Sequence, residues 1–240
     1  MVEAVRLFSD EWSRARAAWV TADPRLYDIT PEQPVERIIE TTATAFGALV
    51  RAILHQQVSI HAGRAITTRL LDACDGELEP AAVARLSEDD LRTIGLSRQK
   101  VFYVSSLAQA TEAGLMDRIE ELSDDEIIAR LTALPGIGAW TAKMFCIFHL
   151  LRPDVFSGED FGLREGIKVL DGLPEQPRPR DAEARAEAWQ PYRSVAAVNL
   201  WDLVRRTRVT ERANRPAPRP RVDRRKTPGA LSDSASVDAE

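Results

Sequence analysis

A chain of 240 residues with a net charge of −5 and a hydrophobic fraction of 44% has enough apolar material for a folded core of one or two domains. No apolar run approaches the ~20 residues that a bilayer-spanning helix requires, so we expect no contact with a membrane. The two cysteines, Cys74 and Cys146, stand far apart and form no CxxC pair. This spacing excludes a four-cysteine zinc or iron–sulfur site and argues against a disulfide framework.

Helical periodicity dominates from Pro34 onward and no alternating strand pattern interrupts it, so the sequence predicts an all-α fold. Residues 1–33 are expected to form an N-terminal extension, with one short helix between Val5 and Trp19. The helices expected in the main domain, residues 34–211, cover residues 35–54, 59–74, 87–94, 97–113, 123–134, 139–151, 182–189 and 193–206. Residues 212–240 are rich in Pro, Arg and Ser, which predicts a disordered tail.

Charge is distributed unevenly along the chain. Ten Lys/Arg and two acidic residues between Arg205 and Lys226 give this segment a charge of about +8, whereas residues 1–204 carry about −10. An acidic globule is poorly suited to charge-driven binding of nucleic acid. A nucleic-acid partner would therefore need local contacts, made by backbone amides, a few cations or the tail.

The most informative segment, residues 131–142, contains Pro135-Gly136-Ile137-Gly138 between two predicted helices. Two glycines around one apolar residue allow a tight turn, and the second helix then begins at once with unpaired N–H groups facing outward. Such a helix end binds a phosphate through its amides and dipole without any basic side chain. A plain corner between two helices is the alternative explanation for the glycines.

Four segments, in order along the chain, resemble the helix-hairpin-helix (HhH-GPD) superfamily of DNA glycosylases: residues 53–59, 134–142, 154–164 and 189–201. The nearest branch is the bacterial 3-methyladenine DNA glycosylase II, in a compact form, because only about 33 residues precede the first matching helix. The resemblance implies two helical subdomains that flank a DNA-binding cleft and carry a helix-hairpin-helix motif. It also implies a monofunctional base-excision repair enzyme that hydrolyses the N-glycosidic bond of flipped-out alkylated purines, such as 3-methyladenine and 7-methylguanine.

The resemblance assigns the essential carboxylate to Asp160, about 20 residues past the hairpin in a loop that opens the next helix. Breaking an N-glycosidic bond develops positive charge on the sugar, and a fixed carboxylate beside the anomeric carbon stabilises that charge and can orient a water. The neighbouring Glu159 is the competing candidate. Either carboxylate could also cap the helix that follows.

A pocket for the damaged base is implied as well, because the target base must leave the duplex to be reached. The expected lining residues are Trp140, Trp201, Met144 and Phe161, and Met144 stands where relatives carry an aromatic residue. Aromatic faces attract the positive charge of alkylated purines. Simple core packing is the alternative role for each tryptophan.

Contacts to DNA are expected from seven residues: Gly136, Ile137, Gly138, Thr141, Gln57, Ser59 and Arg193. Gln57 matches the position of the wedge that fills the gap left by the flipped base, where the best-known relative has an apolar residue. A polar residue at a helix start is the other interpretation of Gln57. Arg193 meets either a phosphate or a structural carboxylate, and the sequence does not decide between them.

Cleavage of the DNA strand is not expected. Relatives that cut the strand form a Schiff base with a lysine located two residues after the second hairpin glycine. Trp140 occupies that position, and Lys143 lies almost a full helical turn further on. No cofactor is expected, apart from a Na⁺ or K⁺ ion that relatives suggest for the hairpin carbonyls of Thr132, Leu134 and Ile137.

The expected partner is double-stranded DNA with damaged bases, bound by a monomer in the cytoplasm in association with the nucleoid. Three other functions stay open at this point. The chain could be a glycosylase for uracil or an oxidised base, a noncatalytic DNA-damage-binding module, or a helical scaffold with no nucleic-acid partner.

Overall fold

The computed structural model describes residues 2–34 and 44–213. These ranges contain helices and no strand, which confirms the predicted all-α fold class. The helices are α1 (Val2–Ala22), α2 (Pro24–Ile29), α3 (Ala45–His55), α4 (Ile60–Ala73), α5 (Pro80–Ala84), α6 (Glu88–Ile94), α7 (Arg98–Glu112), α8 (Asp124–Thr132), α9 (Ala139–Phe148), α10 (Phe161–Asp171), α11 (Pro179–Ala186) and α12 (Arg193–Ala213), with short 3-10 turns η2 (Ile119–Glu121) and η3 (Glu187–Trp189). The tail predicted for residues 212–240 lies outside the described residues from residue 214 onward, as do residues 35–43 of the first predicted main-domain helix.

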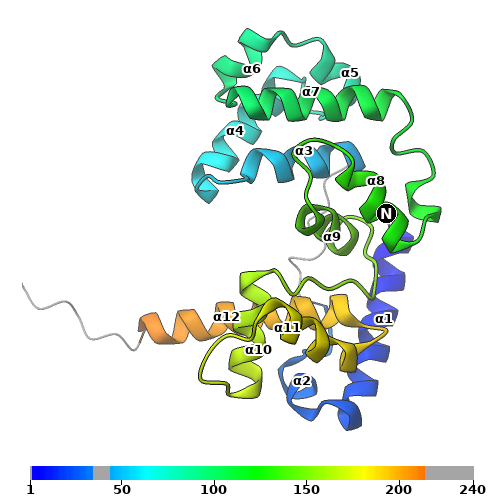
Figure 1. Cartoon of the computed structure of the whole chain (residues 1–240), viewed down its shortest axis with the longest axis vertical. Helices are drawn as coiled ribbons and strands as arrows, with labels where there is room; N and C mark the ends of the chain where they lie inside the picture. The colour runs from blue at the N-terminus through cyan, green and yellow to red at the C-terminus, as the bar shows by residue number, and fades with distance from the viewer. Residues whose placement is uncertain (1, 35–43, 214–240) are drawn as a thin grey trace, which may run out of the picture.

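The helices form two groups, which Figure 1 shows one above the other. In the first group α3 packs against α4, α7 and α9, while α5 and α6 pack against α7. In the second group α10 packs against α12, α11 and α2, and α1 packs against α2 and α12. Helix α9 lies between the two groups in Figure 1, with α8 beside it. No helix within the described ranges is both long and apolar enough to cross a membrane.

The first 33 residues, expected as an extension, form α1 and α2, and both helices pack into the second group. Apolar side chains of these two helices are fully or almost fully buried, among them Trp12, Trp19 and Leu26. Phe8, Trp12, Ala15 and Trp19 recur every three or four residues, so they share one face of α1. The second helical group is therefore built from both ends of the described chain.

A buried carboxylate at the start of α2 bonds to residues of α11 and η3. Asp23, the N-cap of α2, accepts a hydrogen bond from Trp189 Nε1 at 2.8 Å and forms an ion pair with Arg185. Arg185 also binds Asp171 through its Nε at 2.8 Å and lies over the Trp189 ring. Burial opposes ionisation of Asp23, but the hydrogen bonds from Trp189 and Arg185 and the Arg185 charge outweigh it and lower the pKa of this carboxyl.

The predicted hairpin forms between α8 and α9. Helix α8 begins with a capping box of Ser123 and Glu126, in which each side chain bonds the backbone of the other. The turn requires glycine at position 136 for two reasons. Its φ is +84°, which favours glycine, and a Cβ at this position would overlap the ring of Tyr103. Gly138 is the N-cap of α9 and makes no side-chain cap, which leaves the first amides of α9 available to a ligand.

Candidate active site

Asp160 stands at the start of α10 as its N-cap. Its Oδ1 accepts the backbone N–H of Leu163 at 2.7 Å, so the capping role considered from the sequence is present. The side chain is only partly buried. The carboxylate is therefore fixed by the helix and still reachable from solvent.

Both tryptophans predicted to line the base pocket donate hydrogen bonds to Asp160. Trp140 Nε1, on the first turn of α9, lies 2.8 Å from Oδ2, and Trp201 Nε1, on α12, lies 2.9 Å from Oδ1. The three residues are separated by 20 and 41 positions along the chain. Three N–H groups thus hold one carboxylate at the meeting point of α9, α10 and α12, and charge-assisted bonds of this kind are the strong ones.

The indole of Trp201 is supported on two sides. It stacks on Phe148 with ring centroids 5.4 Å apart and an angle of 27° between the planes. The Cδ1–Nε1 edge of the indole packs on Gly162, where a Cβ would lie 2.8 Å from Trp201 Cδ1. Gly166, one turn further along α10, meets Leu200 in the same way, so two glycines bring α10 and α12 close together.

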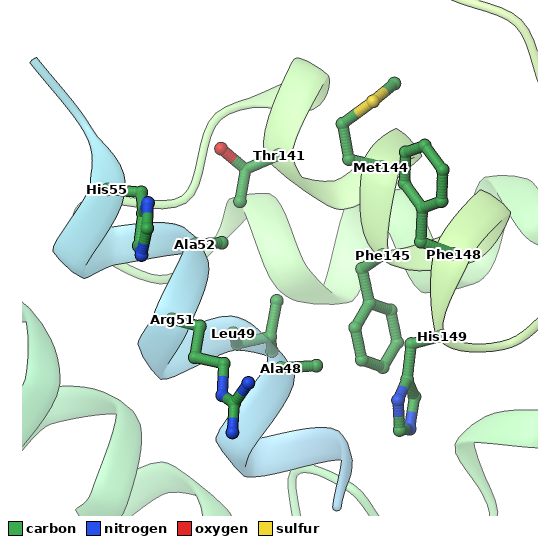
Figure 2. A pocket seen from close by; sticks show the side chains of 10 residues that line it. All are labelled: Ala48, Leu49, Arg51, Ala52, His55, Thr141, Met144, Phe145, Phe148 and His149. Atoms are coloured by element: carbon green, nitrogen blue, oxygen red, sulfur yellow. The ribbon is translucent and has the colours of Figure 1, made fainter. Parts of the chain in front are cut away.

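A pocket of ≈ 290 Å³ opens between α3 and α9, and Figure 2 shows side chains of both helices converging on it. The lining residues are Ala48, Leu49, Arg51, Ala52, His55, Thr141, Met144, Phe145, Phe148 and His149. Phe148 belongs both to this wall and to the stack on Trp201, so the pocket borders the Asp160 site. Of the residues predicted to line the base pocket, Met144 lines it directly.

The two histidines of this pocket favour their neutral forms. Burial lowers the pKa of His149, whose ring stacks on Phe145. Burial also lowers the pKa of His55, helped by the nearby charges of Lys100, Arg64 and Arg51. Neither ring therefore adds a full positive charge to the pocket near pH 7.

The loop after α3 is bonded to the hairpin turn. Gln56 Nε2 donates to the carbonyl of Gly136 at 2.9 Å. Lys100 Nζ donates to the carbonyls of Leu54 and Gln56 at 2.6 and 2.9 Å. Between these anchors Gln57, the predicted wedge, has a φ of +53° and an exposed side chain. The loop thus holds Gln57 outward beside the hairpin.

Other predicted site residues take varied positions. Ser59 caps α4 through the amide of Ala62, and Arg193 forms an ion pair with Asp154, its Nε 2.8 Å from Oδ1. The structural carboxylate considered for Arg193 is therefore present, and a phosphate contact of this residue stays a prediction. Ile137 and Thr141 are buried in the hairpin and α9, whereas Phe161 is 59% exposed next to Asp160.

Glu159, the competing carboxylate, is exposed and lines an open hollow beside α11 rather than the pocket between α3 and α9. Its contacts do not include Trp140 or Trp201, whose indole N–H groups both face Asp160. The described residues contain no group of three or more His, Cys, Asp or Glu side chains that could hold a metal ion.

Sequence reasoning missed Phe148 and the anchors of the Gln57 loop. Trp140, Met144 and Phe148 are spaced four residues apart, which places them along one stripe of α9. Phe148 is 38% exposed and Trp140 47%, so both ends of α9 reach the surface. That four-residue spacing was a signal for Phe148, whereas nothing local pointed to Lys100, whose bonds reach back 44 and 46 residues.

Comparison with protein families gives one matching model. It describes an "HhH-GPD superfamily base excision DNA repair protein" and matches residues 50–191, more than half of the chain. Among curated proteins, DNA-3-methyladenine glycosylase 1 of Schizosaccharomyces pombe is 35% identical over 158 residues, which cover 64% of this chain and 69% of that protein.

Two solved structures are similar in both fold and sequence. A DNA-3-methyladenine glycosidase from Bacillus halodurans has a TM-score of 0.68 and 34% identity, covering 77% of this chain and 86% of that one. The 3-methyladenine DNA glycosylase of S. pombe, solved in complex with abasic DNA, has a TM-score of 0.69 and 30% identity, covering 79% and 95% of the two chains.

Proposed function

Because this chain belongs to the HhH-GPD superfamily of base excision DNA repair proteins, we propose that it is a monofunctional DNA glycosylase that releases alkylated purines from damaged double-stranded DNA. The family membership confirms the resemblance found in the four sequence segments. The S. pombe and B. halodurans relatives, each at least 30% identical, are named as 3-methyladenine DNA glycosylases or glycosidases, and the S. pombe enzyme was solved on abasic DNA. Those names support the alkylated purine as the substrate class.

The observation that carries the proposal is the fixed carboxylate of Asp160. Loss of the base leaves a sugar with oxocarbenium character, and a negative charge held beside the anomeric carbon lowers the energy of that state. Trp140, Trp201 and the amide of Leu163 hold both carboxylate oxygens, so the charge needs little reorganisation during the reaction. The same oxygens can orient the water that attacks the sugar.

The surroundings of Asp160 suit a cationic base. Trp140, Met144 and Phe148 present apolar and aromatic surface along α9. The stack of Phe148 on Trp201 adds aromatic surface from α12 beside Asp160. An alkylated purine carries positive charge, which aromatic faces attract by ~0.5–2 kcal/mol or more. That charge also makes the base a good leaving group, so one carboxylate is sufficient without a separate general acid.

Binding of the duplex is assigned to the hairpin and to the Gln57 loop. The uncapped start of α9 after Gly138 offers amides and a positive helix end to a phosphate. Gln57, held outward by Gln56 and Lys100, is the wedge in this proposal. Both elements belong to one chain, and the proposal is that the protein binds DNA as a monomer. Size-exclusion chromatography with light scattering would test this oligomeric state.

Hydrolysis without strand cleavage is proposed because the hairpin position of the nucleophilic lysine holds a tryptophan. Trp140 occupies the position at which strand-cutting relatives carry a nucleophilic lysine, and Lys143 forms an ion pair with Glu183, 3.3 Å away. Borohydride treatment during turnover should therefore trap no covalent protein–DNA adduct. A trapped adduct would contradict the monofunctional assignment.

The central experiment measures freed bases by HPLC from duplexes that carry 3-methyladenine, 7-methylguanine, uracil or 8-oxoguanine. We expect release of the alkylated purines and loss of at least ~10³-fold in rate for Asp160→Asn, since removal of one preorganised electrostatic group costs this much in other enzymes. Asn keeps the shape and the cap but not the charge, so affinity for abasic-analogue DNA should persist. Glu159→Gln is the matched control and should retain activity.

Two outcomes of the same panel would redirect the proposal. Release of uracil or 8-oxoguanine alone would favour a glycosylase for another lesion. Binding of damaged duplex with no release of any base would favour a damage-binding module.

Two smaller proposals accompany the main one. The carbonyls of Thr132, Leu134 and Ile137 suit a Na⁺ or K⁺ ion, because Thr132 ends α8, where carbonyls lack intrahelical partners. An exchange of NaCl for tetramethylammonium chloride at equal ionic strength should then weaken DNA binding.

A cytoplasmic, nucleoid-associated location is proposed from the DNA substrate, and fluorescence microscopy of a tagged chain would test it.

A further inference from the structure

We propose that Glu183 is a positioning residue that fixes the loop carrying Asp160. The proposal rests on the function assigned to Asp160 above. Glu183 lies on α11 and has no place in the four segments that resemble the family. Its Oε1 accepts the backbone N–H of Gly158 at 2.8 Å, two residues before Asp160.

The loop is packed against α11 at this point. A Cβ on Gly158 would overlap the carbonyl oxygen of Pro179, the first residue of α11, so the loop backbone touches the helix backbone directly. Phe156, Ser157 and Gly158 are buried. Because an amide in a buried segment needs an acceptor, the bond to Glu183 favours this conformation of the loop.

The position of Gly158 is transmitted to Asp160 through one tight turn. The amide of Asp160 donates to the carbonyl of Ser157 at 3.0 Å, so residues 157–160 form a closed turn. Glu183 holds this turn at Gly158, and α10 holds its other end through the bond from Leu163 to Asp160. Asp160 thus lies between two backbone anchors, one held by Glu183 from α11 and the other by the first turn of α10.

A second link runs from Glu183 to the tryptophan that faces Asp160. Lys143 Nζ lies 3.3 Å from the same Oε1, and Lys143 is on α9, one turn after Trp140. Trp140 in turn donates to Asp160 Oδ2. The Glu183 carboxylate therefore joins the Asp160 loop, α11 and α9, and its removal should disturb both the carboxylate and its indole donor.

The test compares Glu183→Ala, Glu183→Gln and Asp181→Ala. Asp181 lies on the same helix and forms an exposed ion pair with Arg178, with no hydrogen bond or ion pair to the Asp160 loop or to α9 among the described residues, so its removal is the matched control. Gln retains an oxygen that accepts from Gly158, and so it should rescue the loss caused by Ala. The readouts are single-turnover base release, affinity for abasic-analogue DNA, and the indole ¹H–¹⁵N signals of the five tryptophans.

For Glu183→Ala we expect base release to fall about 10-fold or more, since small misplacement of a catalytic group has effects of this size, with DNA affinity within about 2-fold of wild type. The indole signals of Trp140 and Trp201 should shift, whereas those of Trp12 and Trp189, which report on the fold, should stay. Glu183→Gln should return the rate to within about 3-fold of wild type, and Asp181→Ala should match wild type throughout.

Unchanged Trp140 and Trp201 signals in Glu183→Ala would overturn the proposal, and so would a failure of Gln to restore them. A loss of all five signals in Glu183→Ala would show that Glu183 stabilises the fold as a whole, and would overturn its specific role in positioning Asp160. The indole readout does not depend on turnover. It therefore stays decisive if wild-type protein releases no base and the proposed function itself fails.

Discussion

The indole of Trp201 rests directly on the backbone of Gly162, so closely that a Cβ there would lie 3.0 Å from Nε1 and 3.1 Å from Oδ1 of Asp160. Glycine at this position is what allows the indole N–H to reach the carboxylate. Gly166, one turn along the same helix, allows instead the close approach of α10 to the backbone of Leu200.

Substitution of these two glycines should have different effects, one on the rate of base release and the other on stability. Gly162→Ala should displace the indole and slow base release by about 10-fold, the equivalent of one charge-assisted hydrogen bond of ~1.5 kcal/mol. Gly166→Ala should instead destabilise the fold by about 1–3 kcal/mol, because the methyl group pushes α10 away from α12. Single-turnover kinetics and urea denaturation of both variants check this, and equal effects on both measurements would contradict it.

Trp140→Phe tests the hydrogen bond apart from the ring. Phenylalanine keeps an aromatic face for the base but cannot donate to Asp160 Oδ2. We expect a rate of base release lower by about 10- to 100-fold, which corresponds to a hydrogen bond to a charged group of ~1.5–3 kcal/mol. Trp189→Phe is the control, since it removes an indole bond to Asp23 and none to Asp160: it should lower the melting temperature and leave the rate unchanged.

Gly138→Asp separates helix stability from DNA binding. The open space around Gly138 and its φ of −90° admit a side chain, and an acidic N-cap should stabilise α9 by about 0.5–1 kcal/mol. The same negative charge should repel a phosphate and weaken affinity for abasic-analogue DNA by about 10-fold, or ~1.4 kcal/mol. Gly138→Asn caps without charge and should bind more tightly than Asp. Equal DNA affinity of the Asp and wild-type proteins would exclude a phosphate at this helix end.

Asp23 predicts a stability that falls in acid. Its pKa in the folded protein is lowered, so the stabilisation is fully present above the ordinary value of 3.8 and is lost as the pH falls through the lower folded value. Asp23→Asn should remove this part of the pH dependence and lower the stability at pH 7 by about 2–4 kcal/mol, because Arg185 loses a buried partner. Melting curves between pH 2.5 and 7 measure both effects, and parallel curves for the two proteins would refute the role of Asp23.

The sequence predicts the helical class and the hairpin well because both depend on local signals. Apolar residues at helical spacing define most helices, and the two glycines at 136 and 138 define the turn. The meeting of Asp160 with Trp140 and Trp201 is different. Separations of 20 and 41 residues carry no local pattern, so only the resemblance to a family predicts this site.

The remaining features depend on tertiary partners that local patterns do not reveal. The spacing of Trp12 and Trp19 predicts a helix, but not that its partner is α12, almost the full length of the described chain away. The pairing of Arg193 with Asp154 is similar, because a phosphate and a carboxylate attract the same guanidinium. Sequence reasoning identifies such a group, and packing selects its partner.

The hydrogen bond from Gln56 to the carbonyl of Gly136 joins the Gln57 loop to the hairpin turn, and Lys100 holds the same loop through the carbonyl of Gln56. A recognition surface that is already rigid loses little conformational freedom on association, so most of the deformation falls on the duplex. Discrimination between sites then follows how readily each base pair opens and unstacks, which is easiest where damage has already weakened it.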